Sequence, residues 1–188
     1  MRPNFSLTAV LAAALLVTTA AADEVEDALE AALEAYRAGD IALAREEVDF
    51  AATLIGQMKA EGLGGFLPEA MAGWTREEGD TSAQALGAFG GGIVANATYV
   101  GAGGSFELTL MAENQMVAAM GAMLSNTALM GSMGTVKRAG RQRYVVTREG
   151  DIQALINNRV MIQITGSAPV EAKEAHFLLI DLAGLADF

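Results

Sequence analysis

Five methionines lie within residues 116–134, which is half of the ten in the chain. They are Met116, Met120, Met123, Met130 and Met133. Thioethers are soft, uncharged donors that favour Cu(I), so this segment could hold copper. On a helix the first three would fall at i, i+4 and i+7 and share one face. The segment therefore has three interpretations: a copper site, an apolar ligand groove, or the packing surface of a core helix.

The residues between the methionines favour core packing. Val117, Gly121, Leu124 and several alanines make the segment apolar nearly all round, which is typical of a buried helix. Methionine also fills irregular gaps where a helix lies against a sheet. The single histidine, His176, is sixty residues from Met116 and adds no nearby imidazole ligand. We therefore predict no metal and no other cofactor, with copper and the apolar groove as alternatives.

Groups for acid, base or nucleophilic catalysis do not gather elsewhere in the sequence. The chain has no cysteine, and His176 lies in an apolar helical pattern that indicates a partly buried residue. Glu149 and Asp151 flank a glycine in an expected turn, which is a poor setting for an acid–base pair. The glycine-rich stretches 87–92 and 101–104 do not lead from a strand into a helix, as a phosphate-binding loop must. We therefore predict that the protein is not an enzyme.

The N-terminal residues predict secretion. Arg2 precedes an apolar run at 7–18, and the alanines at 20–22 offer a cleavage site for signal peptidase. The run is too short to span a bilayer, which takes about 20 residues. We expect a cleaved signal peptide over 1–22, a periplasmic protein, and no stable membrane insertion after cleavage. The absence of cysteine means that the fold depends on its apolar core rather than on disulfides.

The mature chain would be strongly acidic, with 23 acidic and 11 basic residues and a net charge of −12. Such a surface repels phosphate backbones and anionic lipids, so we expect no nucleic-acid partner. The basic residues include one cluster, Lys137, Arg138, Arg141 and Arg143. This cluster could hold an anionic group, but we favour a charged strand edge that is protected from pairing.

Residues 23–62 carry a helical pattern in two halves. Leu29, Leu33 and Tyr36 recur at i, i+4 and i+7, and Gly39 with Asp40 suits the end of one helix and the cap of the next. We predict an antiparallel helical hairpin with small residues at its contact. Its apolar stripe can be covered by the rest of the protein or by a second copy, so a homo-oligomer through the hairpin is one expectation.

Residues 63–92 are predicted to be a connector without regular structure. Phe66, Leu67 and Trp74 are its apolar anchors, while Pro68 and Gly73 oppose regular elements. The large apolar area of Trp74 indicates a plug over the edge of the core rather than a ring that stacks on a ligand.

Residues 93–188 alternate between apolar and polar side chains in short runs separated by turn residues. Asn157 and Asn158 suit a two-residue hairpin turn because asparagine tolerates positive φ. Together these patterns predict an α+β fold. It consists of an antiparallel β-sheet with helices packed on one face, preceded by an N-terminal antiparallel helical hairpin. The order of the strands stays open.

Two resemblances accompany these patterns. Residues 34–51 resemble one helix pair of the tetratricopeptide family, but no second copy follows, so a peptide-binding solenoid is not indicated. The segments "FLPEAMAGW", "FGGGIVANATYVGAGGSFELTLM", "VKRAGRQRYVVTREGDIQALINNRVMIQITG" and "IDLAGLADF" resemble a group of uncharacterised secreted proteins of Gram-negative bacteria. The meander is also similar to PsbP-like envelope domains. These resemblances imply a periplasmic domain and bring no catalytic residues.

The sequence therefore predicts a non-enzymatic periplasmic protein that binds or scaffolds an unknown envelope protein. Candidate contacts are the exposed side of the helix pair and the residues Phe66, Leu67 and Trp74. The alternative function is a carrier of an apolar molecule or of Cu(I) on the methionine-rich helix face.

Overall fold

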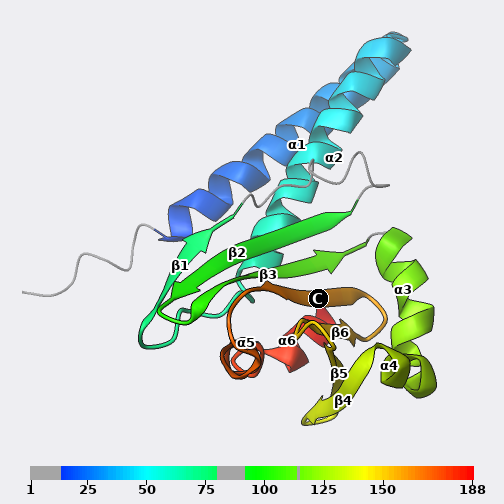
Figure 1. The fold of residues 1–188 in the computed structure, drawn as a ribbon. Coiled ribbons are helices and arrows are strands. Elements are labelled where there is room, and N and C mark those ends of the chain that lie inside the picture. Colours follow the sequence, from blue (N-terminus) through cyan, green and yellow to red (C-terminus); the bar gives the residue numbers. More distant parts are fainter. Residues whose placement is uncertain (1–13, 80–91, 114) are drawn as a thin grey trace, which may run out of the picture. The chain divides into compact units, whose positions relative to one another are not determined.

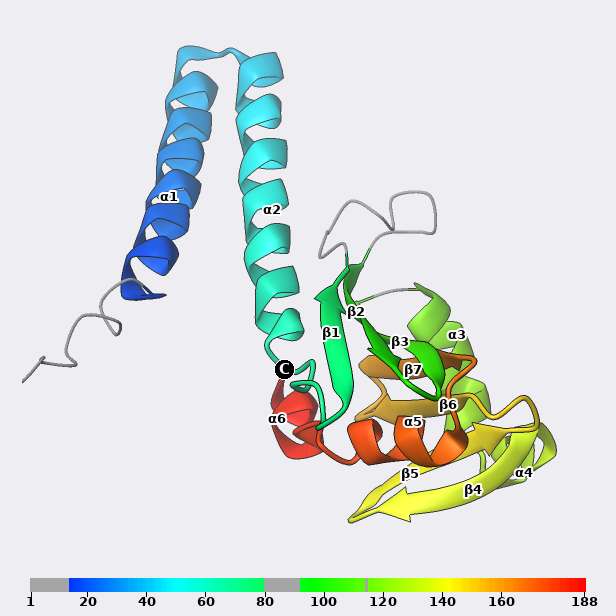
Figure 2. The same ribbon diagram turned by 60° about the vertical axis from the view of Figure 1, so that its left-hand side comes forward.

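Two long helices open the computed structural model, which describes residues 14–79, 92–113 and 115–188 (Figures 1 and 2). The chain forms two compact units, Met1–Met58 and Lys59–Phe188. Residues 1–13 of the predicted signal peptide lie outside the described residues, as does most of the glycine-rich stretch 87–92. No helix in the described ranges is both long and apolar enough to cross a bilayer.

The first unit is the predicted helical hairpin. α1 (Ala14–Ala38) and α2 (Ile41–Gly64) run antiparallel, and α2 ends in the second unit. Gly39 takes a φ of 84° between the helices, and the carboxylate of Asp40 accepts a hydrogen bond from the backbone N–H of Leu43 at 3.1 Å, which caps α2. The most buried residues of this unit are alanines, namely Ala28, Ala32 and Ala35 on α1 and Ala44 and Ala51 on α2. The helices therefore meet through small side chains, as the sequence predicts.

The second unit is built on one seven-stranded antiparallel sheet. Its strands are β1 (Trp74–Glu78), β2 (Ile93–Gly101), β3 (Gly104–Ala112), β4 (Gly134–Ala139), β5 (Gln142–Thr147), β6 (Ile152–Ile156) and β7 (Val160–Gly166). They lie in the order β1-β2-β3-β7-β6-β5-β4. Asn157 and Asn158 have φ of 48° and 55° and turn β6 into β7, which confirms the predicted hairpin.

Helices lie on both faces of this sheet (Figures 1 and 2). On one face, alternate strand residues such as Tyr99, Leu108 and Ile162 form the main core with Phe177 of α5 (Val170–Phe177) and Leu185 of α6 (Leu182–Asp187). A smaller cluster on the other face packs under α3 (Gln115–Ser125) and α4 (Thr127–Met133). The predicted α+β class with its preceding helical pair is confirmed, and the structure adds a helical layer on the second face.

The pairing register explains where this second layer stops. Val94, Met111, Met161 and Leu155 lie side by side across four strands and form the apolar patch under α3 and α4. The row two residues further along the strands is polar and consists of Asn96, Thr109, Gln163 and Gln153. Helices cover the apolar row because only there does burial remove hydrocarbon from water.

The prediction of a structureless connector is wrong for residues 74–78, which form β1 along the edge of β2. This strand was not recognised because three of its five residues are charged and its alternation spans only five positions. The charged residues suit an edge strand, where one side of the strand faces water.

Candidate functional site

The methionine segment forms α3 and α4, with Asn126 capping α4 by accepting a hydrogen bond from the Ala128 N–H at 2.9 Å. Met130 is 1% exposed, and Met120 and Met133 pack partly buried against the same apolar cluster. Met123 is exposed, while the side chain of Met116 lies outside what the structure describes. The described thioethers thus differ in burial rather than converging on one open site, and most of them pack in the core as the sequence favours.

Methionine oxidation should follow this burial. We expect dilute hydrogen peroxide to convert Met123 to its sulfoxide at least about five times faster than Met130, because exposed thioethers react first. Peptide mass spectrometry over a time course measures both rates, and the similarly exposed Met71 serves as an internal control. Equal rates for Met123 and Met130 would contradict a core position for α4.

The predicted partner-contact residues of the connector pack inside their own domain instead of forming a shared exposed patch. Leu67 is buried in the main core, and the ring of Phe66 packs edge-on against Phe188 with centroids 6.0 Å apart. The Trp74 ring lies on the core edge, 5.3 Å from the Phe106 ring. Trp74 is therefore a plug over the core, as its large apolar area predicts.

His176 is fully buried among aromatic rings. The rings of Trp74, Tyr99 and Phe106 lie 4.9–5.4 Å from the imidazole. Its Nδ1 is 2.9 Å from the Ala172 carbonyl, so Nδ1 donates, and Nε2 accepts a 3.4 Å hydrogen bond from the Met71 N–H. These contacts suit a neutral imidazole with a packing role.

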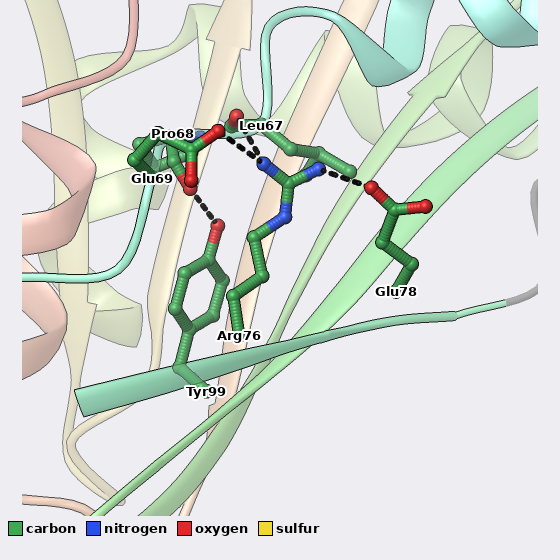
Figure 3. Close-up of polar contacts among 6 residues, drawn as sticks. All are labelled: Leu67, Pro68, Glu69, Arg76, Glu78 and Tyr99. Carbon is green, nitrogen blue, oxygen red and sulfur yellow. Dashed lines mark hydrogen bonds and ion pairs between the residues drawn. The ribbon is translucent and has the colours of Figure 1, made fainter.

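A polar cavity of about 390 Å³ lies beside β1 and is lined in part by Arg76, whose polar contacts are drawn in Figure 3. The Arg76 guanidinium donates to the Leu67 carbonyl at 3.2 Å and lies 3.5 Å from a Glu69 oxygen and 3.4 Å from a Glu78 oxygen. Sequence reasoning missed this residue because β1 was not recognised. Only the charged pattern "TREE" of residues 75–78 could have indicated an edge strand there.

The hydrogen bonds beside this cavity hold a backbone segment against the sheet. The Tyr99 hydroxyl donates to the Pro68 carbonyl, so Tyr99 and Arg76 together hold the 67–69 backbone against the sheet. Burial raises the pKa of Tyr99 to about 12, with Arg76 acting in the opposite direction. The side chains of Glu69 and Glu78 are mostly exposed although they contact Arg76. Among the described residues, no group of three His, Cys, Asp or Glu side chains could hold a metal ion.

A second polar cluster joins β4 and β5 to α5. Lys137 Nζ contacts both carboxylate oxygens of Glu174 at 2.7 and 2.8 Å, and the Tyr144 hydroxyl donates to the same carboxylate at 3.0 Å. Burial, then the hydrogen bond to the Glu174 carboxylate, raises the pKa of Tyr144 to about 12. A tyrosine held protonated in this way is a structural donor and not a general base.

The raised tyrosine pKa values predict a loss of stability at high pH. An unfolded tyrosine ionises near pH 10, about two units below Tyr144 and Tyr99 in the fold, so deprotonation favours the unfolded chain. We expect the contribution of these tyrosines to the free energy of unfolding to be fully present below about pH 10. It should then be lost progressively from about pH 10 to about pH 12. Urea unfolding across this range tests it, and Tyr144→Phe should flatten the decline.

The largest set of exposed apolar side chains lies on the hairpin. Nine of the fifteen large apolar residues that are exposed in the described part of the chain fall within α1 and α2. They are Leu29, Leu33, Tyr36, Ile41, Leu43, Val48, Phe50, Ile55 and Met58. The alanines take the positions between the helices, so the larger side chains remain beside that contact. This surface was indicated by the sequence pattern and is the feature best suited to hold a partner.

No protein-family model, no curated protein and no solved structure matches the chain.

Proposed function

We propose that the chain is a non-enzymatic binding or scaffolding protein of the bacterial periplasm that holds another protein on one side of its helical hairpin. The observation that carries this proposal is the exposed apolar surface of α1 and α2. The periplasmic location rests on the signal-like pattern of residues 1–22.

Apolar surface of this kind is informative because nothing in a helical hairpin requires it. A hairpin joined through alanines could carry polar residues at every outer position and remain soluble. Covering one half-exposed Leu, Ile or Val would contribute about 1 kcal/mol, so six of them contribute about 6 kcal/mol before the costs of association. Those costs are estimated at about 4–15 kcal/mol, which suits a reversible partner whose binding also uses polar contacts.

The carrier alternative has less support. It requires the thioethers to face a common ligand, whereas Met130 is buried and Met123 is exposed. An enzymatic function would need reactive groups gathered in one cavity, but the Arg76 cavity is lined by arginine, carboxylates and an asparagine, without a histidine. Protein binding is therefore the function that we favour.

Site-specific photo-crosslinking tests the proposal in cells that make the protein naturally. A photoreactive residue at Leu33 or Val48, both on the exposed surface, should give discrete adducts with another envelope protein. The same residue at Glu149, which is exposed in the second unit, is the control and should give no such adduct. Leu29→Asp should abolish the adducts formed from Leu33. The absence of adducts at Leu33 and Val48 in a folded, exported protein would refute the proposal.

A further inference from the structure

The exposed apolar residues of the hairpin fall into rows. On α1, Leu29, Leu33 and Tyr36 lie at i, i+4 and i+7 and are 46–65% exposed. On α2, Ile41, Val48 and Ile55 recur every seven residues and are 41–61% exposed. At 100° per residue, both rows lie on the same side of the alanine contact, because the two helices run antiparallel. We call these six residues the apolar stripe.

A row of carboxylates runs along the α1 side of this stripe. Glu26, Glu30 and Glu34 recur every four residues and are all exposed, and each of the first two lies three residues before a leucine of the stripe. Like charges at i and i+4 on a helix repel, which destabilises α1 slightly when nothing neutralises them. Among the described residues of the first unit, one ion pair forms, between Arg45 and Asp49 on α2 at 3.7 Å.

The negative charge of the protein is concentrated in this unit. Residues 23–58 contain ten acidic and two basic side chains, a net charge of −8. Residues 59–188, more than three times as many, contain thirteen acidic and nine basic side chains, a net charge of −4. Two hairpins brought face to face would therefore repel each other, and an anionic lipid surface would be repelled too.

From this arrangement we infer that the partner docks a basic amphipathic helix on the hairpin. The inference rests on the proposed function and names the chemistry of its partner. The apolar face of that helix covers the apolar stripe, since rows spaced by three, four and seven residues accept another helix. Its lysines and arginines lie over Glu26, Glu30 and Glu34, which relieves the repulsion within α1.

Defined peptides test the inference on the full mature chain. The probe is a labelled 21-residue peptide with leucine at the a and d heptad positions and lysine or alanine elsewhere. One comparison peptide has the same composition without the heptad order, and another has glutamate in place of lysine. Fluorescence anisotropy should show binding of the probe, and at least roughly tenfold weaker binding of both comparison peptides, because charge and apolar spacing are both required.

Matched variants separate the carboxylate row from general acidity. Glu26→Gln, Glu30→Gln and Glu34→Gln together should weaken probe binding roughly tenfold and remove most of its salt dependence. Glu77→Gln, Glu149→Gln and Glu171→Gln make the same charge change at exposed positions of the second unit and should leave binding nearly unchanged. Leu33→Asp should abolish binding, and circular dichroism checks that each variant keeps its helix content.

Several results would overturn the inference. One such result is that the two triple glutamate-to-glutamine variants lose binding equally, and another is that the peptide without the heptad order binds as well as the probe. Either result would mean that binding is only a general attraction between opposite charges. Sedimentation that shows a dimer sensitive to Leu33→Asp would make a second copy the occupant. If crosslinks at Leu33 and Val48 reach a partner while the probe fails to bind, the proposed function stands and only the basic helix is wrong.

Discussion

Replacing Phe106 by alanine is expected to lower the free energy of unfolding by about 4 kcal/mol. Its ring is 1% exposed and stacks on Tyr99 with centroids 4.9 Å apart. It also lies 5.0 Å from the imidazole of His176 and 5.3 Å from the Trp74 ring. Removing the ring leaves a cavity bordered by three large rings, which cannot all move in to fill it.

Urea unfolding followed by far-ultraviolet circular dichroism measures this loss, and Leu178→Ala is the matched control. Leu178 is 57% exposed in the same unit, so its truncation should change the free energy of unfolding by less than about 0.5 kcal/mol. A loss below about 1.5 kcal/mol for Phe106→Ala would show that the aromatic cluster is not the centre of the core.

Replacing Asp151 by alanine is expected to cost about 3 kcal/mol, and more than replacing its partner Lys173 by methionine. Lys173 is 1% exposed, and its Nζ donates to the Asp151 carboxylate at 3.3 Å and to the Gly166 carbonyl at 3.0 Å. Without Asp151, a buried ammonium loses its counter-charge. Without Lys173, the carboxylate of Asp151 still reaches water because its side chain is 28% exposed.

A double-mutant cycle checks this asymmetry. Lys173→Met should cost about 1 kcal/mol, and adding Asp151→Ala to it should cost little more, because the buried charge is already gone. Additive losses, measured by urea unfolding of the four proteins, would mean that the two side chains contribute independently.

The parts of the fold that sequence predicted are those set by local pattern. The alternation of apolar and polar residues marks the strands that form β2 and β3, and Asn157 with Asn158 predicted the turn between β6 and β7. The neighbours of each strand could not be predicted in this way. β3 pairs with β7 and not with β4, because the register depends on contacts between segments about fifty residues apart.

The burial of side chains that depends on distant partners could not be predicted from the sequence either. Leu179 is exposed because α5 ends at Phe177 and the chain turns there. Lys173 is buried because Asp151, twenty-two residues away, provides a counter-charge. Charged side chains are rarely buried unless they are paired, and the pairing is visible only in the fold.

The candidate interaction residues were likewise predictable only in part. The row of Leu29, Leu33 and Tyr36 follows from helical spacing alone and is exposed in the structure. Leu67 and Trp74 were also candidate contacts, but their segment packs on the core and includes a strand. An apolar side chain in a segment without periodicity can lie inside or outside, so sequence could not separate these cases.

The strand order also bears on behaviour at high concentration. In the described part of the chain, β1 and β4 are the two outer strands of the sheet, and each has a partner on one side only. β4 carries Lys137 and Arg138, and β1 carries Arg76, Glu77 and Glu78. Charged outer strands resist the addition of a strand from a neighbouring molecule. Concentrated solutions should therefore resist growth into cross-β fibrils, so that any ordered assembly of this protein proceeds through its helices.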